Sequence, residues 1–195
     1  MRRYHSIDDL IAKLDAPNRT ACARLLADHR TLFATVQGST NNHQTWRGGY
    51  LDHVTDAMNV AVVLHEELSG LRPLPFSLSD LLLVVYLHDL EKPWKFELGP
   101  DGGLRHKAEL STKESHQQFR MQKLADYGVV LTAEHENGLK YAEGELADYT
   151  NKRRMMGPLA AMAHMCDVAS ARLWFDYPAA AGDPWLGAGR VAAAG

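Results

Sequence analysis

The sequence predicts an all-α protein, organised as a single-domain helical bundle. Segments of helical length recur along its 195 residues, and capping or stop residues such as Ser6, Pro17, Ser77 and Gly128 bound them. The chain shows no internal repeat and no second domain, and its 46% hydrophobic content is sufficient for one core. Helices with apolar faces bury them against one another, so we expect a bundle.

Two helices are expected in the N-terminal region, residues 1–45. Ser6 can cap a short helix whose first turn holds two aspartates, where the helix dipole favours acidic groups. A second helix starts near Pro17, because proline is tolerated at the first helical position. A polar, turn-rich loop follows at residues 37–49. We expect residues 1–45 to pack on the rest of the core.

The remaining helices are expected in residues 46–177. A long apolar helix starts at Tyr50, after two glycines, and ends near Gly70. The apolar run Leu81–Leu87 fits either a buried strand or a buried helix, but the serine caps before it and Pro93 after it favour a helix. Four further segments are predicted: a turn or hairpin at 98–106, a helix at 107–128, a short helix with a polar loop at 129–154, and a last helix at 156–178.

The last residues, 178–195, are rich in alanine and glycine and have little to bury, so we expect a flexible tail. The formal net charge of −3 provides no general attraction to nucleic acid or to anionic membranes. No apolar run is long enough to span a bilayer, and the N-terminus has no signal-peptide pattern. Two cysteines far apart indicate neither a disulfide scaffold nor a thiolate zinc site. A cytoplasmic location is expected.

Three apolar segments carry a histidine or an aspartate that needs a partner. Asp167 is the only Asp, Glu, Lys or Arg in the stretch Gly157–Ala171, and an unpaired buried carboxylate costs several kcal/mol. His88 and Asp89 stand together at the end of an apolar run, and His53 lies in the long apolar helix. A core histidine with a hydrogen bond, or a buried arginine beside an aspartate, would explain each case separately. One shared metal ion would explain all of them together.

The pattern of these segments resembles the HD-domain superfamily of metal-dependent phosphohydrolases. The motif order is His…His-Asp…Asp, in "GGYLDHVTDAMNVA", "LHDLEKPW" and "AHMCDVASA". The Gly-Gly-x-x-x-His spacing is similar to the branch that contains 3′–5′ exoribonucleases. The resemblance covers roughly residues 46–174 and implies a helical bundle around a metal ion. It implies the ligands His53, His88, Asp89 and Asp167.

An imidazole and carboxylate donor set without thiolates suits a divalent manganese, iron, cobalt, nickel or magnesium ion better than structural zinc. A second ion is an open expectation, with His116 and His135 as its ligands. Both fall between the His-Asp motif and the last aspartate, where dinuclear HD proteins supply additional histidines, and each has an apolar neighbour on its predicted helix. His116 also fits a solvent-facing position, and His106 and His164 are rival ligands.

Two cations are expected to meet a phosphorylated substrate. Lys92 follows Asp89 by three residues and so projects from nearly the same helical face. Arg47 precedes the glycine pair on a loop. Each also fits an ordinary surface position, and Glu91 is expected to be solvated. Asp89 and Lys92 are the expected catalytic residues.

The expected function is hydrolysis of a phosphoester in a nucleotide or short oligonucleotide by metal-activated water. Two other classes stay open: an HD-type di-iron oxygenase, and a non-catalytic binding module that keeps its metal. The expected partner is a phosphorylated small molecule, with no membrane and no strong nucleic-acid surface, and a homodimer is allowed. The substrate and the native metal are not determined by the sequence.

Overall fold

The computed structural model describes residues 2–98, 104–145 and 148–189, and it is mostly helical, which confirms the all-α class. The α-helices are α1 (Ile7–Ile11), α2 (Asn18–Phe33), α3 (Gly49–Leu71), α4 (Leu78–Leu87), α5 (Lys113–Tyr127), α6 (Ala133–Tyr141) and α7 (Pro158–Val168). The shorter elements are the 3₁₀ turns η1 (Lys92–Trp94) and η2 (Ala108–Leu110), the antiparallel strands β1 (Phe96–Leu98) and β2 (Leu104–His106), and the π-helical turn η4 (Ala169–Leu173).

Side-chain caps start four of these helices. Ser6, Ser77, Thr112 and Thr132 each accept a hydrogen bond from a backbone N–H of the first turn, and a side chain of that turn returns a bond to the cap. Such reciprocal bonds satisfy donors that a helix start leaves open. At the other end of α5, Gly128 takes a left-handed conformation at φ 72°, as its position in the sequence predicted.

Helix α4 ends earlier than the sequence predicted. We expected it to continue to Pro93, but the α-helix stops at Leu87 and His88 is its C-cap. Beyond it, the N–H groups of Leu90 and Lys92 bond to carbonyls three residues back, which tightens the chain into successive 3₁₀-like turns before Pro93. The motif residues His88 and Asp89 therefore occupy the turn that leaves the helix.

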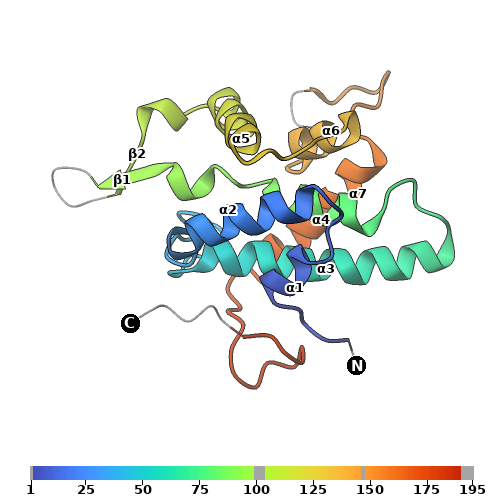
Figure 1. The fold of residues 1–195 in the computed structure, drawn as a ribbon, viewed down its shortest axis with the longest axis horizontal. Coiled ribbons are helices and arrows are strands. Elements are labelled where there is room, and N and C mark those ends of the chain that lie inside the picture. The colour runs from blue at the N-terminus through green and yellow to red at the C-terminus, as the bar shows by residue number, and fades with distance from the viewer. Residues whose placement is uncertain (1, 99–103, 146–147, 190–195) are drawn as a thin grey trace.

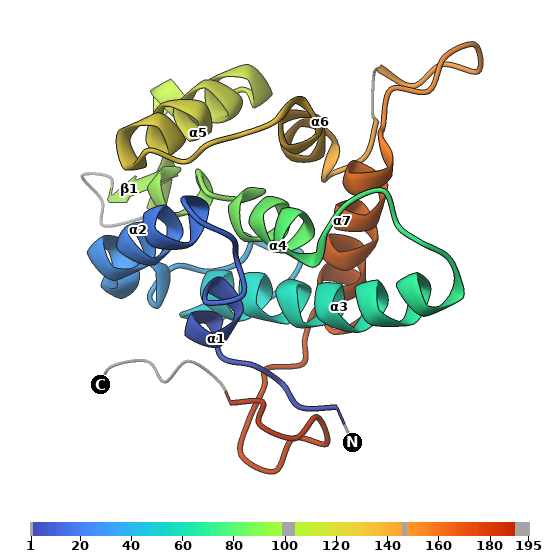
Figure 2. The same cartoon turned by 45° about the vertical axis from the view of Figure 1, so that its right-hand side comes forward.

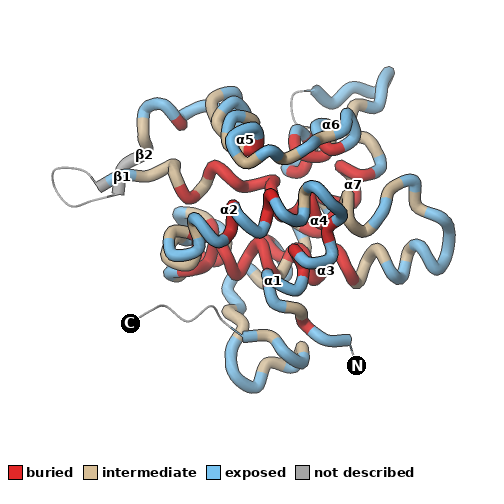
Figure 3. Tube along the Cα trace, in the orientation of Figure 1, coloured by how far each residue is buried: buried red, intermediate tan, exposed pale blue. Residues whose placement is uncertain are grey.

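Helix α4 lies at the centre of the molecule (Figure 1). It packs against α3, α6 and α7, and α7 in turn crosses α3 steeply (Figure 2). All residues from Leu81 to Leu87 are buried, with at most 1% of their surface exposed. The burial pattern in Figure 3 concentrates on α4 and on the stretch of α3 beside it. The run was therefore a buried helix, and α3, α4 and α7 meet around one core.

The N-terminal helices belong to the same core. Leu10 of α1 and Leu25 of α2 are fully buried within the apolar cluster that α3 and α4 form. The C-terminal segment, expected as a flexible tail, returns to the N-terminal segment over its described part. The backbone N–H of Tyr4 donates to the carbonyl of Leu186 at 2.8 Å, and the Tyr4 ring meets the Trp185 ring edge-on. Residues 190–195 lie outside the described residues.

Both cysteines, Cys22 and Cys166, are buried thiols without a disulfide. Among the described residues, no helix combines the length and the apolar character that crossing a membrane requires.

Close packing between α4 and α6 yields a stability prediction. A Cβ on Gly138 would lie 2.9 Å from both γ-carbons of Val84, whereas a Cβ on Gly70 would meet nothing within 4 Å. We expect Gly138→Ala to destabilise the fold by about 1–3 kcal/mol through overpacking. The matched control Gly70→Ala should be neutral or stabilise by up to about 1 kcal/mol, because alanine favours the helix. Thermal unfolding checks both, and an unchanged midpoint for Gly138→Ala would contradict the packing.

Candidate metal centre

Two glycines bring the loop before α3 against the start of that helix. Gly48 has a left-handed conformation at φ 83°, and a Cβ on Gly49 would lie 1.9 Å from the carbonyl oxygen of Gln44. A side chain at position 49 is therefore excluded, and residues 37–47 can fold against the helix start. His53 follows one turn into α3 and is fully buried.

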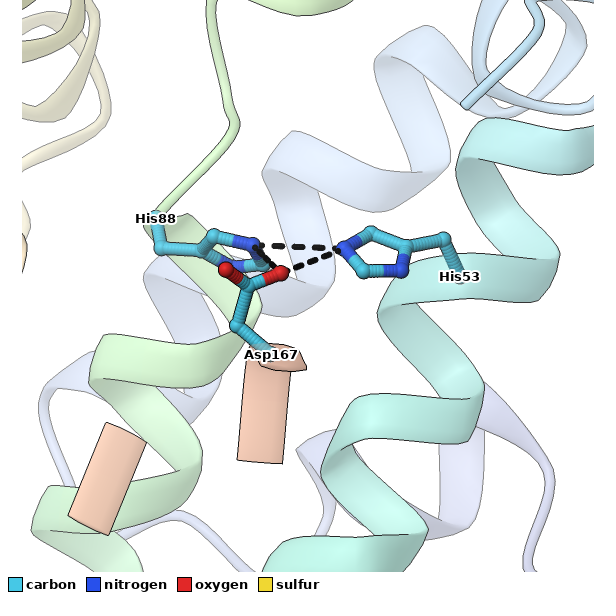
Figure 4. Close-up of side chains that lie close together, drawn as sticks. All are labelled: His53, His88 and Asp167. Carbon is cyan, nitrogen blue, oxygen red and sulfur yellow. Dashed lines mark hydrogen bonds and ion pairs between the residues drawn. The ribbon is translucent and has the colours of Figure 1, made fainter. Parts of the chain in front are cut away.

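His53, His88 and Asp167 converge from α3, the end of α4 and α7 (Figure 4). The Nε2 atoms of the two histidines are 3.4 Å apart. Oδ1 of Asp167 lies 3.2 Å from Nε2 of His53 and 3.5 Å from Nε2 of His88. The imidazoles are buried, and 17% of the Asp167 side chain is exposed. One corner of the cluster therefore reaches solvent.

Hydrogen bonds on the far side of each ring set the tautomer that a metal ligand needs. Nδ1 of His88 donates to the carbonyl of Val85 at 2.7 Å, so its Nε2 carries the lone pair when the ring is neutral. Nδ1 of His53 lies 3.1 Å from the Oγ of Ser170. Ser170 is fully buried, and its hydroxyl is also hydrogen-bonded to Asp56. If Ser170 donates to that carboxylate, it accepts from His53, and both Nε2 atoms face the cluster as acceptors.

Asp89 lies beside this cluster and is held by Lys92. Its Oδ2 is 3.2 Å from Nε2 of His88 and 3.6 Å from Nε2 of His53. The Nζ of Lys92 is 2.5 Å from the same oxygen, and only 17% of the Lys92 side chain is exposed. The structure therefore brings together all four sequence-predicted ligands, and it pairs Lys92 with Asp89, as the three-residue spacing predicted.

Burial and charge shift the titration of the cluster. Burial lowers the pKa of His53, and hydrogen bonding to Asp167 offsets this only in part. Burial by itself lowers the pKa of His88 too, but Asp89 and Asp167 outweigh it and raise that pKa well above its usual value. Burial raises the pKa of Asp89, yet His88 and Lys92 hold it well below its usual range. Without a bound cation, the cluster balances its carboxylates with a proton on His88 and the charge of Lys92.

The donor atoms fit one metal ion. One ligand atom each from His53, His88 and Asp167 lies within 4.8 Å of the other two. Ligands bound at about 2.0–2.2 Å to one ion are about 3–3.5 Å apart in adjacent positions, which matches the separations of these atoms. The cluster could hold a metal ion, whose identity the donor set does not decide beyond favouring nitrogen and oxygen chemistry.

His116 and His135, expected as the ligands of a second ion, do not come together. His135 is buried at the opposite end of α4, where its Nε2 contacts Asp80 at 3.0 Å and its Nδ1 accepts from the backbone of Thr132. Asp80 belongs to the first turn of α4 and His88 caps the last, so the prediction of His135 as a metal ligand beside His88 is wrong. The polar start of α6 uses this histidine for capping.

His116 comes nearer to the cluster. It lines the same cavity as His88, but its Nε2 contacts the carbonyl of Leu110 at 2.9 Å, and it is not part of the three-residue ligand group. The rival His164 contacts the carbonyl of Ala142 through Nδ1 at 2.7 Å. His106 lies in β2, and its side chain is outside the described residues.

Arg47 is exposed and does not line the cavity beside His88. The position of Arg47 therefore does not support the expectation that it contacts a substrate in that cavity. Glu91, expected to be solvated, is 4% exposed, and its Oε2 lies 3.9 Å from Nη1 of Arg120. That correction follows from the early end of α4, which turns Glu91 inward.

Sequence reasoning missed two groups near the site. The ring of His43 lies 4.7 Å from that of His53, and burial lowers its pKa to about 4, helped by His53 and Lys92. It comes from the loop before α3, where only the adjacent glycine pair indicated a close approach. Arg120 on α5 was the second, and nothing in its surrounding polar sequence distinguished it.

Comparison with protein-family models, with curated proteins and with solved structures finds no match for this chain.

The convergence of three ligands predicts which histidines control metal affinity. His88→Ala should weaken binding of Co²⁺ or Mn²⁺ by at least about tenfold, since losing even a hydrogen-bond partner of a metal ligand typically lowers metal affinity about 10–100-fold. His135→Ala is the matched control and should leave metal affinity unchanged, because it lies at the other end of α4. Isothermal titration of metal into each folded variant measures this. Equal losses of metal affinity in both variants would show that the ion does not bind at His53, His88 and Asp167.

The raised pKa of His88 predicts pH-dependent metal binding. At neutral pH without metal, His88 carries a proton, which an ion must displace from Nε2. The carboxyl groups of Asp89 and Asp167 have lowered pKa values and stay ionised, so they add no proton release. Metal affinity should therefore rise between about pH 6 and 8, by up to roughly tenfold per unit for one displaced proton. Titrations at several pH values test this, and a flat profile would contradict it.

Proposed function

We propose that the protein is a metal-dependent phosphohydrolase of the HD type that acts on a small phosphoester, with a nucleotide as the leading substrate class. The observation that carries the proposal is the buried group of His53, His88 and Asp167, with Asp89 in contact with both histidines and Lys92 paired with Asp89. The motif resemblance and this convergence support each other, because the residues named by the motif come from segments far apart in the chain.

A bound divalent ion at His53, His88 and Asp167 would supply Lewis acidity toward a phosphoryl oxygen and a nucleophile at neutral pH. Lys92 supports the charge balance of this chemistry. Its Nζ pairs with the buried Asp89, and the carboxylates of Asp89 and Asp167 raise the pKa of Lys92 although burial by itself lowers it. A cation fixed there stabilises negative charge that develops on a phosphoryl group, and needs no reorganisation when it does so.

A cavity of about 300 Å³ adjoins the cluster and would accept the substrate. Its wall includes His88, Glu91, His116 and Arg120. This volume is at the lower end for small-molecule sites, which favours a mononucleotide-sized ligand over a long polymer. The cavity therefore supports the small-substrate form of the proposal.

Arg120 is the cavity's prepared anion-binding group. Its side chain is 11% exposed, and its buried Nε makes no hydrogen bond among the described residues. A buried donor without a partner costs about 1–3 kcal/mol, which a ligand oxygen would recover. The Oε2 of Glu91 lies 3.9 Å from Nη1 of Arg120 and is also a buried atom without a hydrogen bond among the described residues. We assign Arg120 to a phosphate oxygen and Glu91 to positioning Arg120.

A substrate screen tests the proposal. Protein loaded with Mn²⁺ should release phosphate or nucleoside from at least one nucleoside mono-, di- or triphosphate, cyclic nucleotide or short oligonucleotide. His53→Ala, folded by circular dichroism, should abolish that release. Oxygen consumption by iron-loaded protein without any hydrolysis would replace the proposal with oxygenase chemistry. Metal binding with neither reaction would leave a binding module.

Lys92→Ala should lower turnover on the best substrate by on the order of 10²-fold, the scale of losing one group that stabilises transition-state charge. Metal content should be retained, because the ligand group of His53, His88 and Asp167 does not include Lys92. Lys13→Ala, at an exposed position beyond α1, is the matched control and should keep normal turnover. Steady-state kinetics with metal analysis of both variants would reject the assignment if Lys92→Ala behaved like the control.

A further inference from the structure

A second cavity lies between the outer face of α3 and the two terminal segments. Its volume is about 320 Å³, and Tyr4, Trp174, Tyr177 and Trp185 contribute four aromatic rings to its wall. Figure 2 shows the N-terminal segment and the C-terminal loop close together beneath α3. None of the four belongs to the cavity beside His88.

The rings are set at steep angles to one another. Tyr4 and Trp185 meet at 89° with centroids 5.2 Å apart, and Trp174 and Trp185 meet at 63° with centroids 6.0 Å apart. These are edge-to-face contacts, and the same three side chains also line the cavity. The electron-rich faces of aromatic rings attract cations within about 6 Å of the centroid.

Two carboxylates complete the wall, Asp56 from α3 and Asp183 from the C-terminal segment. Within the described residues, neither forms an ion pair with a lysine or arginine. The side chain of Arg3 passes beside Gly187 and is exposed. Burial, with Asp52 and Asp183 nearby, raises the pKa of Asp56 to about 6 although Ser170 donates to it. The cavity thus combines aromatic walls with negative charge that has no cation.

We propose that this aromatic cage binds a small quaternary ammonium ion. A primary ammonium group needs several hydrogen-bond acceptors when it leaves water, and a metal ion needs a shell of oxygen ligands. The cage offers mainly apolar ring surface and two carboxylates. A methylated ammonium group needs no acceptor, and it gains from ring faces and negative charge together. The volume of about 320 Å³ fits a small molecule.

The proposal stands apart from the phosphohydrolase assignment, since no metal ligand lines the cage. Choline titrated into the full-length protein, followed by calorimetry and tryptophan fluorescence, should give saturable binding that chelation of metal with EDTA leaves intact. The neutral isostere of choline, in which a tert-butyl group replaces trimethylammonium, should bind at least about tenfold more weakly. Equal binding of both compounds, or none to the folded protein, would overturn the proposal.

Variants locate the site. Asp56→Asn and Trp185→Leu should each weaken choline binding by about tenfold or more, whereas Asp126→Asn and Tyr149→Leu, at exposed positions elsewhere, should bind normally. Circular dichroism checks that each variant is folded, and Trp185→Phe, which keeps an aromatic wall, should recover part of the affinity. Losses equal to those of the controls would place choline elsewhere. Tighter binding of a trimethyl-lysine peptide than of choline would reject a small-molecule occupant.

Discussion

The carboxylates buried against two imidazoles are the constraint on which this molecule depends. Asp89 is 2% exposed and shares its oxygen with Lys92 and His88, while Asp167 reaches both histidines. Buried charges of this kind persist only where partners compensate them. Three helices must meet at one point to supply these partners. The charge balance of the cluster therefore depends on the crossing of α3, α4 and α7. The early end of α4 serves it by releasing His88 and Asp89 into a turn.

The candidate metal centre and the aromatic cage lie on neighbouring sides of α3. His53 contacts Ser170, and Ser170 contacts Asp56, which lines the cage. One buried hydroxyl therefore lies between the metal ligand and the acidic wall of the second cavity. Ser170 lies on the π-helical turn η4, and Trp174, which lines the second cavity, is the C-cap of that turn.

The cavity beside His88 has a different character from the cage. It contains Arg120, whose buried Nε makes no hydrogen bond in the part of the chain that the structure describes, and its acidic and basic side chains include the pair Lys140 and Asp148, 2.7 Å apart. An anion would find one prepared donor there, beside the cluster. The cage offers rings and carboxylates, which suit a cation. The two cavities therefore differ in their walls: acidic and basic side chains together line the one beside His88, whereas aromatic rings and two carboxylates line the cage.

Sequence alone predicted the helical class, the caps of several helices and the four residues that the fold brings together, because caps and apolar runs act locally and a lone charge in an apolar segment requires a partner. Tertiary structure decided what local patterns do not contain. Like His53, His135 lies on a predicted helix with an apolar neighbour, but the packing of α6 places its side chain against Asp80. Arg120, His43 and the aromatic cage arise from segments distant in sequence, and their chemistry depends on which surfaces the packed helices bring together.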